Sequence, residues 1–369
     1  MIPAESAFRD EVRRWLAARP APAARPDGFP AREEIREFSS ALHAAGFAGV
    51  SWPVEHGGRG LPAAFDAIAA EELVRAGRGD HVGIIGLGMV GPAILAVGTA
   101  DQRNRFLPRI LSGETLFCQG FSEPEAGSDL AALRTSAAEA DGMFVVDGHK
   151  LWSTGAPVAD HCLLLARTEP GSRGHRGLSC LLVDLRTEGV TVRPLRQLSG
   201  ETRFGELLFD QVPVPADAVL GPVGGGWRVA MTTLAHERGT FGVRLAAALS
   251  AEFAEFTAML RRRGLDRDPV ARDRVARVWI EVAGVRAAAH RVAGAEPGPE
   301  ASIVKLRWSR AEQRLAALAF DLLGDGDSAD HARWRHARLR SRGATLEGGT
   351  SEVLRDVLAE RVLGLPRAR

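Results

Sequence analysis

Cysteine is scarce in this chain of 369 residues, which contains only three. Cys118, Cys162 and Cys180 are odd in number and show no CxxC spacing. These features argue against a disulfide framework and against a zinc site. We therefore expect the protein to work in a reducing cytoplasm.

An excess of charge of either sign is also absent. Lysine plus arginine number 47 and aspartate plus glutamate 46, so the formal net charge is +1. Without an overall electric field, neither nucleic acid nor an acidic membrane surface is an expected partner. Any anion that binds must be held by a local arrangement of donors.

The sequence lacks an apolar run long enough to cross a membrane. The best candidate, Val82 to Gly98, falls just short of the roughly 18 apolar residues of a spanning helix. It also contains five glycines and Pro92. Met1 to Asp10 carries acidic residues and no apolar stretch of the kind found in signal peptides. We expect a buried, tightly packed helix at Val82 to Gly98, with no membrane span and no secretion signal.

A dinucleotide-binding turn is suggested only formally, by three glycines between Gly86 and Gly91 that match GxGxxG. That motif requires a strand before it, a helix after it and an acidic residue about 20 positions further on. Here a helical pattern precedes, Pro92 follows closely, and Phe106 to Leu111 offers no carboxylate. We interpret the glycines as sites of close helix packing.

A zinc-protease motif is also present only in part. His236 and Glu237 match the start of the zinc-protease pattern HExxH, but Thr240 stands where the second histidine is required. No metal site is predicted.

Basic residues are concentrated between His331 and Arg342, and a smaller group lies at Arg261 to Arg263. Such clusters are ordinarily solvated helix faces. For the longer run, a local phosphate site or a partner-facing surface stays open as an alternative.

The spacing of apolar residues changes twice along the chain. Up to about Leu111 it is helical, with interruptions by proline and glycine. Short β-branched or leucine-rich runs follow, separated by DG, PG, EG and SG turns. They lie at 144–146, 162–166, 178–183, 190–192 and 207–209. Long helical segments then occupy 228–263, 269–293 and 300–323.

This order of helices, strands and helices predicts an α+β multidomain protein rather than an alternating α/β fold. With 45% hydrophobic residues, the chain can bury a sizeable core. We expect an N-terminal α-helical domain at residues 1–115, a middle β-domain (a small barrel or sandwich) at 116–220, and a C-terminal helical bundle at 221–369.

Two segments combine residues suited to a flat polar ligand. Cys118 to Asp129 joins small and hydroxyl residues to a proline and a glycine, which is typical of a strand end opening into a loop whose NH groups and hydroxyls face a ligand. In Lys150 to Thr154, Trp152 and Thr154 lie two apart and would share one side of a strand. A flat ring system with polar edges would fit an apolar wall next to a hydroxyl.

The motifs make the sequence resemble the acyl-CoA dehydrogenase family over nearly the whole chain. The SEPxAGSD stretch of that family is present as Ser122 to Asp129, its KxWxT as Lys150 to Thr154, and its GTSE as Gly349 to Glu352. Ala359 to Gly364 agrees as well. The resemblance implies an α-helical domain, a β-domain and a C-terminal four-helix bundle, in the order expected above.

The resemblance also implies FAD as cofactor. Phe121 and Ser122 would contact the pyrimidine edge, Trp152 would lie against the ring, and Ser153 and Thr154 would reach the region near N5. The start of the last helix would approach the same cofactor, because its free NH groups and dipole favour the pyrophosphate. The residues implied there are Thr350, Ser351 and Glu352.

Desaturation of an acyl thioester requires a base for the α-hydrogen, a hydride acceptor for the β-hydrogen and donors to the thioester carbonyl. Many members of the family place a glutamate directly before GTS, but Gly348 stands there, and Glu347 is one residue early. A second subgroup has the base on a bundle helix directly before an arginine, as Glu237 stands before Arg238. We predict Glu237 as the base, with an ion pair to a nearby arginine as the alternative.

The same resemblance implies substrate contacts at Ser128 and Arg238, together with backbone contacts at Gly348 and Gly349. The substrate would be acyl-CoA or an acyl group on a carrier protein. An electron-transfer flavoprotein would take up the electrons.

Two family features on the adenine side of the flavin are altered. Arg261 to Asp268 contains no RxxFG pattern, and Asp325 replaces the second glycine of QxxGGxG. An acid near a pyrophosphate would repel it. This pattern resembles bacterial two-gene dehydrogenases and predicts either a heteromer with a related subunit or a homo-oligomer that binds FAD differently. A non-catalytic pairing subunit and a flavin oxidase or monooxygenase on the same fold stay open as alternatives.

Overall fold

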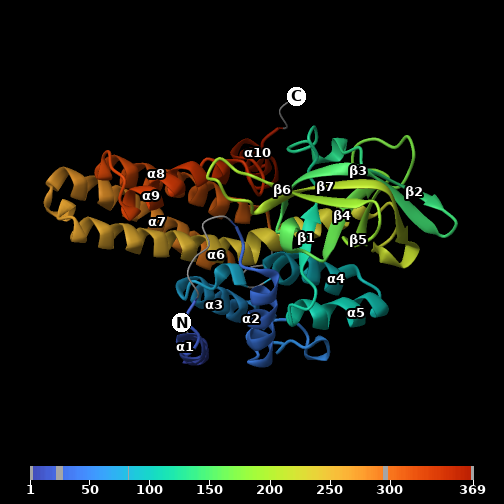
Figure 1. Ribbon diagram of the computed structural model, residues 1–369, viewed down its shortest axis with the longest axis horizontal. Coiled ribbons are helices and arrows are strands. Elements are labelled where there is room, and N and C mark those ends of the chain that lie inside the picture. Colours follow the sequence, from blue (N-terminus) through green and yellow to red (C-terminus); the bar gives the residue numbers. More distant parts are fainter. Residues whose placement is uncertain (1–2, 22–27, 82, 294–297, 367–369) are drawn as a thin grey trace. The chain divides into compact units, whose positions relative to one another are not determined.

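The structure is a computed structural model that describes residues 3–21, 28–81, 83–293 and 298–366 (Figure 1); the side chains of residues 3 and 235–241 also lie outside the description. The chain forms two compact units, each built from separate stretches of sequence. One comprises residues Met1–Pro20, Ala67–Gly79 and Arg238–Arg369, and is called the bundle unit below. The other, Ala21–Asp66 with Asp80–Glu237, is called the sheet unit. The domain limits at 115 and 220 stay a prediction.

An eight-stranded sheet forms the centre of the sheet unit (Figure 1). Its order is β6-β7-β3-β2-β4-β5-β8, and β1 pairs in parallel with β4. The strands are β1 (Phe117–Gly120), β2 (Ser136–Ala140), β3 (Met143–Thr154), β4 (His161–Arg167), β5 (Leu178–Asp184), β6 (Val190–Leu195), β7 (Phe204–Pro215) and β8 (Val219–Leu220).

Burial along the strands follows their sequences. Along β7 buried and less buried residues alternate, as expected of a strand with one face on the core. By contrast, six consecutive residues of β4 and of β5 are buried, in agreement with their nearly unbroken apolar runs. All three cysteines are buried and unpaired in β1, β4 and β5.

Helices accompany the sheet in the same unit. They include α2 (Arg32–Ala44), α4 (Gly91–Val97) and α5 (Ala100–Leu111). The segment predicted to be one buried helix at 82–98 instead contains a π-helix at Gly86–Val90 followed by α4. None of the described helices is long and apolar enough to cross a membrane.

Two of the three glycines of the GxGxxG pattern, Gly86 and Gly91, allow close packing as the sequence predicted, whereas a Cβ on Gly88 would meet nothing within 4 Å. A Cβ on Gly91 would lie 2.2 Å from the ring of Trp52, and one on Gly86 would lie 3.1 Å from Ile110. Because a side chain at Gly91 would overlap the indole, only glycine allows this approach. Among the described residues before the pattern there is no strand, which agrees with rejecting a dinucleotide-binding turn.

The bundle unit contains the long helices that the apolar spacing predicted (Figure 1). They are α6 (Gly226–Arg262), α7 (Pro269–Ala293), α8 (Ser302–Leu323) and α9 (Ala329–Arg340), and α6 begins within the sheet unit. The same unit contains α1 (Pro3–Ala17), most of α3 (Ala63–Arg75) and α10 (Ser351–Arg361). The core of the bundle includes the buried side chains of Phe256, Leu315 and Trp334.

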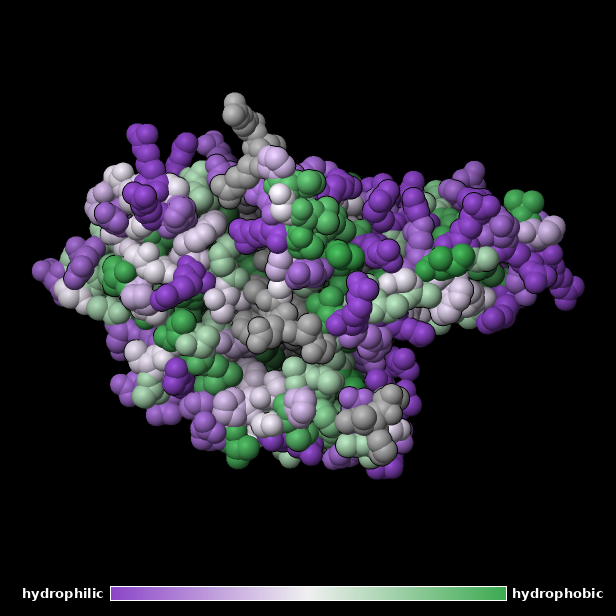
Figure 2. Space-filling view, turned by 180° about the vertical axis from the view of Figure 1, so that it is seen from behind, coloured by the Kyte–Doolittle hydropathy of each residue, from purple (hydrophilic) through white to green (hydrophobic). Residues whose placement is uncertain are grey.

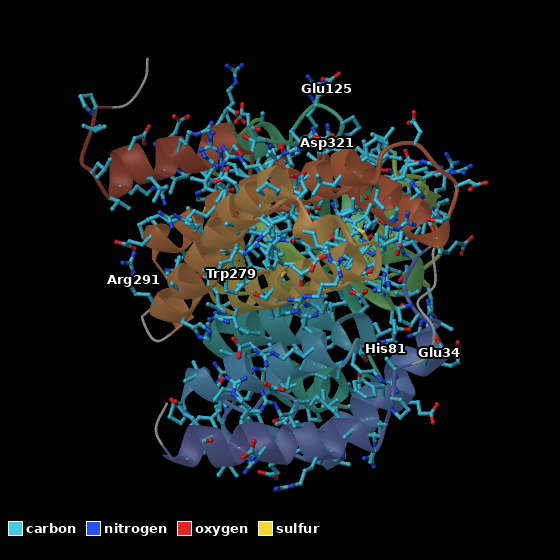
Figure 3. All side chains as sticks on the ribbon, turned by 90° about the vertical axis from the view of Figure 1, so that its left-hand side faces the viewer. Glu34, His81, Glu125, Trp279, Arg291 and Asp321 are labelled. Carbon is cyan, nitrogen blue, oxygen red and sulfur yellow. The ribbon has the colours of Figure 1, made fainter. Side chains whose placement is uncertain are left out.

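Aromatic contacts cross the bundle core. The Phe256 and Trp334 rings meet edge to face, with centroids 5.6 Å apart. Trp279 of α7, labelled in Figure 3, lies 5.2 Å from the Phe253 ring of α6. These contacts join α6 to α9 and to α7.

Candidate active site

The end of β3 carries the KxWxT residues and contains a β-bulge. The pairing of β3 with β7 shifts register between Lys150 and Ser153, so the residues between them leave the ladder. Trp152 has φ 60°, a left-handed conformation that is unusual for a bulky residue, and its side chain is 58% exposed. Ser153 is buried and Thr154 half-buried. That Trp152 and Thr154 share one side of the strand stays a prediction, and the sequence did not indicate the bulge.

The SEPxAGSD segment begins directly after β1. Phe121 is buried and Ser122 is half-buried, whereas Ser128 is exposed further along the loop. The Leu151 amide donates a 2.9 Å hydrogen bond to the carbonyl of Ser122. This bond joins the two motifs, which lie 29 positions apart in the sequence, so the sheet unit brings Phe121 and Ser122 next to the bulge of β3.

Several polar atoms around this junction have no hydrogen-bond partner among the described residues. The hydroxyls of Ser122 and Thr154 make no hydrogen bond with any described residue. Ser153 Oγ and Gln119 Nε2 are buried and also have no partner among the described residues. Buried polar atoms are normally hydrogen-bonded, so such atoms call for a ligand or water. An exposed indole beside unpaired hydroxyls fits a flat ring with polar edges, as in a flavin.

The GTSE residues lie at the start of α10 in the bundle unit. The Thr350 hydroxyl caps the helix by accepting a 3.2 Å hydrogen bond from the Val353 amide. Ser351 is buried, whereas Glu352 is exposed and lies 3.5 Å from Arg355. The first-turn amides of this helix, with its dipole, suit a phosphate group.

Two glycines in left-handed conformations lead into this helix. Gly348 has φ 60° and Gly349 has φ 91°, and a Cβ on Gly349 would lie 3.1 Å from Leu354. The buried Lys305 of α8 donates a 2.7 Å hydrogen bond to the Gly349 carbonyl. The turn before α10 is therefore fixed by a side chain of another helix.

Family models match the chain in three consecutive parts. They are described as the acyl-CoA dehydrogenase N-terminal domain at residues 3–114, the middle domain at 118–212 and the C-terminal domain at 224–363. The chain belongs to the acyl-CoA dehydrogenase family. The predicted fold class and the predicted family are thus both confirmed.

Relatives of this acyl-CoA dehydrogenase extend over nearly its full length. The acyl-CoA dehydrogenase IpdE1 of Mycobacterium tuberculosis is 40% identical, covering 98% of this chain and 97% of that protein. IpdE1 of Mycolicibacterium smegmatis is 39% identical, with the same coverage. Among solved structures, the Tcur3481-Tcur3483 steroid ACAD has a TM-score of 0.90 at 28% identity, covering 100% of this chain and 99% of that chain. The ChsE4-ChsE5 complex from Mycobacterium tuberculosis has a TM-score of 0.86, also at 28% identity, with 100% and 99% covered.

Glu347, the carboxylate nearest to the missing base position of this acyl-CoA dehydrogenase, is engaged elsewhere. It forms an ion pair of 2.9 Å with Arg340 at the end of α9. This pairing supports the prediction that Glu347 is not the base. Glu237 and Arg238 lie in α6, but their side chains are outside the described residues, so their roles stay predictions.

Sequence reasoning overlooked a group of charged residues in the bundle of this acyl-CoA dehydrogenase. Arg333 of α9 contacts Glu252 and Glu255 of α6 at 3.2 and 3.0 Å. Glu312 of α8 has a buried Oε2 atom with no hydrogen-bond partner among the described residues. Burial, and next the charge of Glu252, raise the pKa of Glu312 to about 8.

Three arginines of the basic run at 331–342 have partners within the bundle. Arg333 binds the two glutamates of α6, Arg340 binds Glu347, and Arg335 donates to the Gly326 carbonyl. On the face shown in Figure 2, the bundle at the right is mostly hydrophilic and is interrupted by small hydrophobic patches. These contacts agree with an ion-paired helix face at Arg333 and Arg340, and the alternative of a phosphate site or partner-facing surface stays a prediction.

Proposed function

We propose that this chain is an FAD-dependent dehydrogenase that removes hydrogen from the α and β carbons of an acyl thioester. The observation that supports it most is the junction of Ser122 with Leu151, which brings the SEPxAGSD and KxWxT residues together beside an exposed Trp152. Bound flavin would supply the hydride acceptor for the β-hydrogen. The residues of the chain must hold the ring, orient the thioester and take the α-proton.

Two sets of residues would hold the cofactor. Phe121, Ser122, Trp152, Ser153 and Thr154 would contact it from the sheet unit. Thr350, Ser351 and Glu352 would approach the cofactor from the start of α10. That these two sets meet at one cofactor is part of the proposal, since they belong to different compact units.

The acyl thioester would be oriented by Ser128 and Arg238, and its carbonyl by the backbone at Gly348 and Gly349. An amide directed at that oxygen stabilises the negative charge that develops when the α-proton leaves. A glutamate in an apolar pocket has a raised pKa, which suits proton abstraction near neutrality. We assign this role to Glu237.

The decisive experiment is anaerobic bleaching of the bound flavin by a panel of acyl thioesters. Glu237→Gln keeps the size of the side chain but removes the base, and we expect bleaching to slow by a factor of roughly 10² to 10⁴. Glu347→Gln is the matched control, because Glu347 is the other candidate carboxylate and is bound by Arg340. Normal bleaching in Glu237→Gln, or a loss confined to Glu347→Gln, would refute the assignment.

The panel should also separate the substrate classes. Offering the same acyl groups on coenzyme A and on a carrier protein tests which of them presents the substrate. Because a structure similar to this chain is named a steroid ACAD, thioesters of steroid side chains should be included. Oxygen consumption during turnover would favour the oxidase or monooxygenase alternative, whereas electron transfer to an electron-transfer flavoprotein would favour the dehydrogenase.

We further propose that the chain pairs with a related dehydrogenase subunit. Two similar structures are named as pairs, Tcur3481-Tcur3483 and ChsE4-ChsE5. Asp325 is exposed in the loop after α8, at the position where the family motif has glycine. A related subunit with that glycine intact would supply adenine-side contacts without the repulsion of a carboxylate.

A further inference from the structure

An ion pair is completely buried where the SEPxAGSD segment meets β3. The Lys150 side chain is 0% exposed, and its ammonium lies 2.8 Å from Glu123 Oε1. The same ammonium donates a 3.0 Å hydrogen bond to the carbonyl of Phe121. A Cβ on Gly120 would lie 3.5 Å from Cγ of Lys150, so the lysine stem passes close to the end of β1.

The carboxylate of Glu123 is bound on both oxygens. Oε1 also accepts from the Thr135 amide at 2.8 Å, and Oε2 accepts from the Arg134 amide at 2.7 Å. Burial by itself would raise the pKa of Glu123, but the charge of Lys150 and these hydrogen bonds hold it below its usual value. The carboxylate is therefore ionised at neutral pH. It connects its own segment to β3 and to the residues that lead into β2.

The pair and its neighbour Leu151 act on the backbone of two proposed ring contacts, Phe121 and Ser122. Lys150 holds the Phe121 carbonyl, and the next residue, Leu151, holds the Ser122 carbonyl. The residue after Leu151 is Trp152, whose left-handed backbone is unfavourable for a side chain of its size. Such a conformation persists only where the surroundings fix it. Lys150 and Glu123 lie on the buried side of this bulge.

We propose that Lys150 and Glu123 form a positioning pair that holds Phe121 and Ser122 in register with Trp152 and so sets the shape of the flavin-ring site. This inference rests on the proposed function. Neither residue touches the ring in this proposal, because both act through the backbone of their neighbours.

Stability alone is a poor explanation for this ion pair. Well-packed apolar residues often replace a buried pair without loss of stability, because removing two charges from water is costly. An apolar side chain at position 150 would, however, leave the Phe121 carbonyl without its donor. The buried ammonium of Lys150 binds a backbone carbonyl and a carboxylate at the same time. It can therefore fix the position of the Phe121 backbone relative to β3.

The test uses the double variant Lys150→Met with Glu123→Gln, which removes both charges and avoids an unpaired buried ion. Flavin affinity is measured by titration, the emission and absorption bands of bound flavin by spectroscopy, and folding by circular dichroism. We expect the double variant to show a cooperative thermal transition and to bind flavin at least 10-fold more weakly. The emission of bound flavin should be stronger, because an indole held against the flavin ring quenches flavin emission.

The matched control is Glu125→Gln, which makes the same substitution in the same segment. Glu125 is 76% exposed, pairs only weakly with Arg134 at 3.4 Å, and points outward in Figure 3. We expect its flavin affinity and emission to equal those of the unsubstituted chain. A double variant that folds and also equals the unsubstituted chain in both readouts would overturn the proposal.

If the double variant does not fold, a second variant tests the positioning pair. Glu123→Gln alone keeps Lys150 on the Phe121 carbonyl, and we expect a several-fold loss of flavin affinity with a change in emission. If it behaves like Glu125→Gln, the proposal is wrong. None of these readouts needs turnover, so a chain that binds flavin but is not bleached by thioesters would refute the proposed function and leave the positioning pair testable.

Discussion

At the scale of single residues, the bulge at Trp152 shows how a site departs from regular structure. A tryptophan at φ 60° stores backbone strain on the order of 1–3 kcal/mol. Its ring gains little from burial, since it is mostly exposed and, among the described residues, its one aromatic neighbour is Phe204, edge to face at 5.9 Å. A strained, exposed aromatic residue contributes little to folding, which agrees with a role in binding.

Trp152→Gly separates the effect of the indole on folding from its effect on flavin binding. Glycine adopts positive φ without strain, so we expect the free energy of unfolding without flavin to stay within about 1 kcal/mol of the original. Loss of the ring wall should weaken flavin binding by about an order of magnitude, in line with roughly 1–3 kcal/mol for a base stacked on an aromatic ring. Thermal melts and flavin titration measure the two quantities. A large loss of stability without flavin would show that the indole is structural.

At the scale of elements, the helices α6, α8 and α9 bring charged residues together in the bundle. Glu312 of α8 faces Glu252 of α6, Arg340 of α9 and Glu347 beyond it. Burial, followed by the charge of Glu252, raises its pKa to about 8, so the folded chain holds a proton there at neutral pH. Burial likewise raises the pKa of Glu252, although Arg333 opposes this shift.

The pH dependence of the bundle follows from the raised pKa of Glu312. A carboxyl whose pKa is raised by folding adds stability that is fully present below the unfolded pKa, about 4.5, and is lost as the pH rises to about 8. Glu312→Gln cannot ionise at this position. Its free energy of unfolding, relative to that of the original chain, should therefore rise by at least about 1 kcal/mol between pH 5 and pH 8.5.

Thermal midpoints at the two pH values measure this effect. Glu139→Gln, which changes an exposed carboxylate of β2, is the control. Its difference in thermal midpoint from the original chain should not increase with pH. If Glu312→Gln and the original chain differ in thermal midpoint by the same amount at both pH values, the assignment of the proton to Glu312 is wrong.

At the scale of the whole molecule, the proposal is that the flavin site is completed by a second chain. The expected adenine-side contacts are altered at Asp325, which is exposed and carries a negative charge where a glycine is usual in the family. A carboxylate there would oppose the pyrophosphate of a partner's cofactor. The near-zero net charge of the chain provides no compensating field.

We therefore expect the chain purified alone to contain less than one flavin per chain, and its complex with a related dehydrogenase subunit to contain more. Asp325→Gly should raise the flavin content of the chain alone. The ratio of flavin to protein absorbance measures the content, and light scattering measures the assembly. Tightly bound, stoichiometric flavin in the isolated chain would argue for a homo-oligomer instead.

The sequence by itself determined the family, the order of helices and strands, and the long helices of the bundle, whose limits at α6, α7 and α8 fall within about two residues of those predicted. These features depend on the spacing of apolar residues and on short motifs, both of which are local.

Only the tertiary structure decided how distant residues meet. The bulge at Trp152 arises from the pairing of β3 with β7, and the burial of Lys150 depends on Glu123, 27 positions earlier. The charged cluster around Glu312 likewise joins three helices. Burial and pairing across long sequence separations depend on the packing of whole elements, and no short window of sequence contains that information.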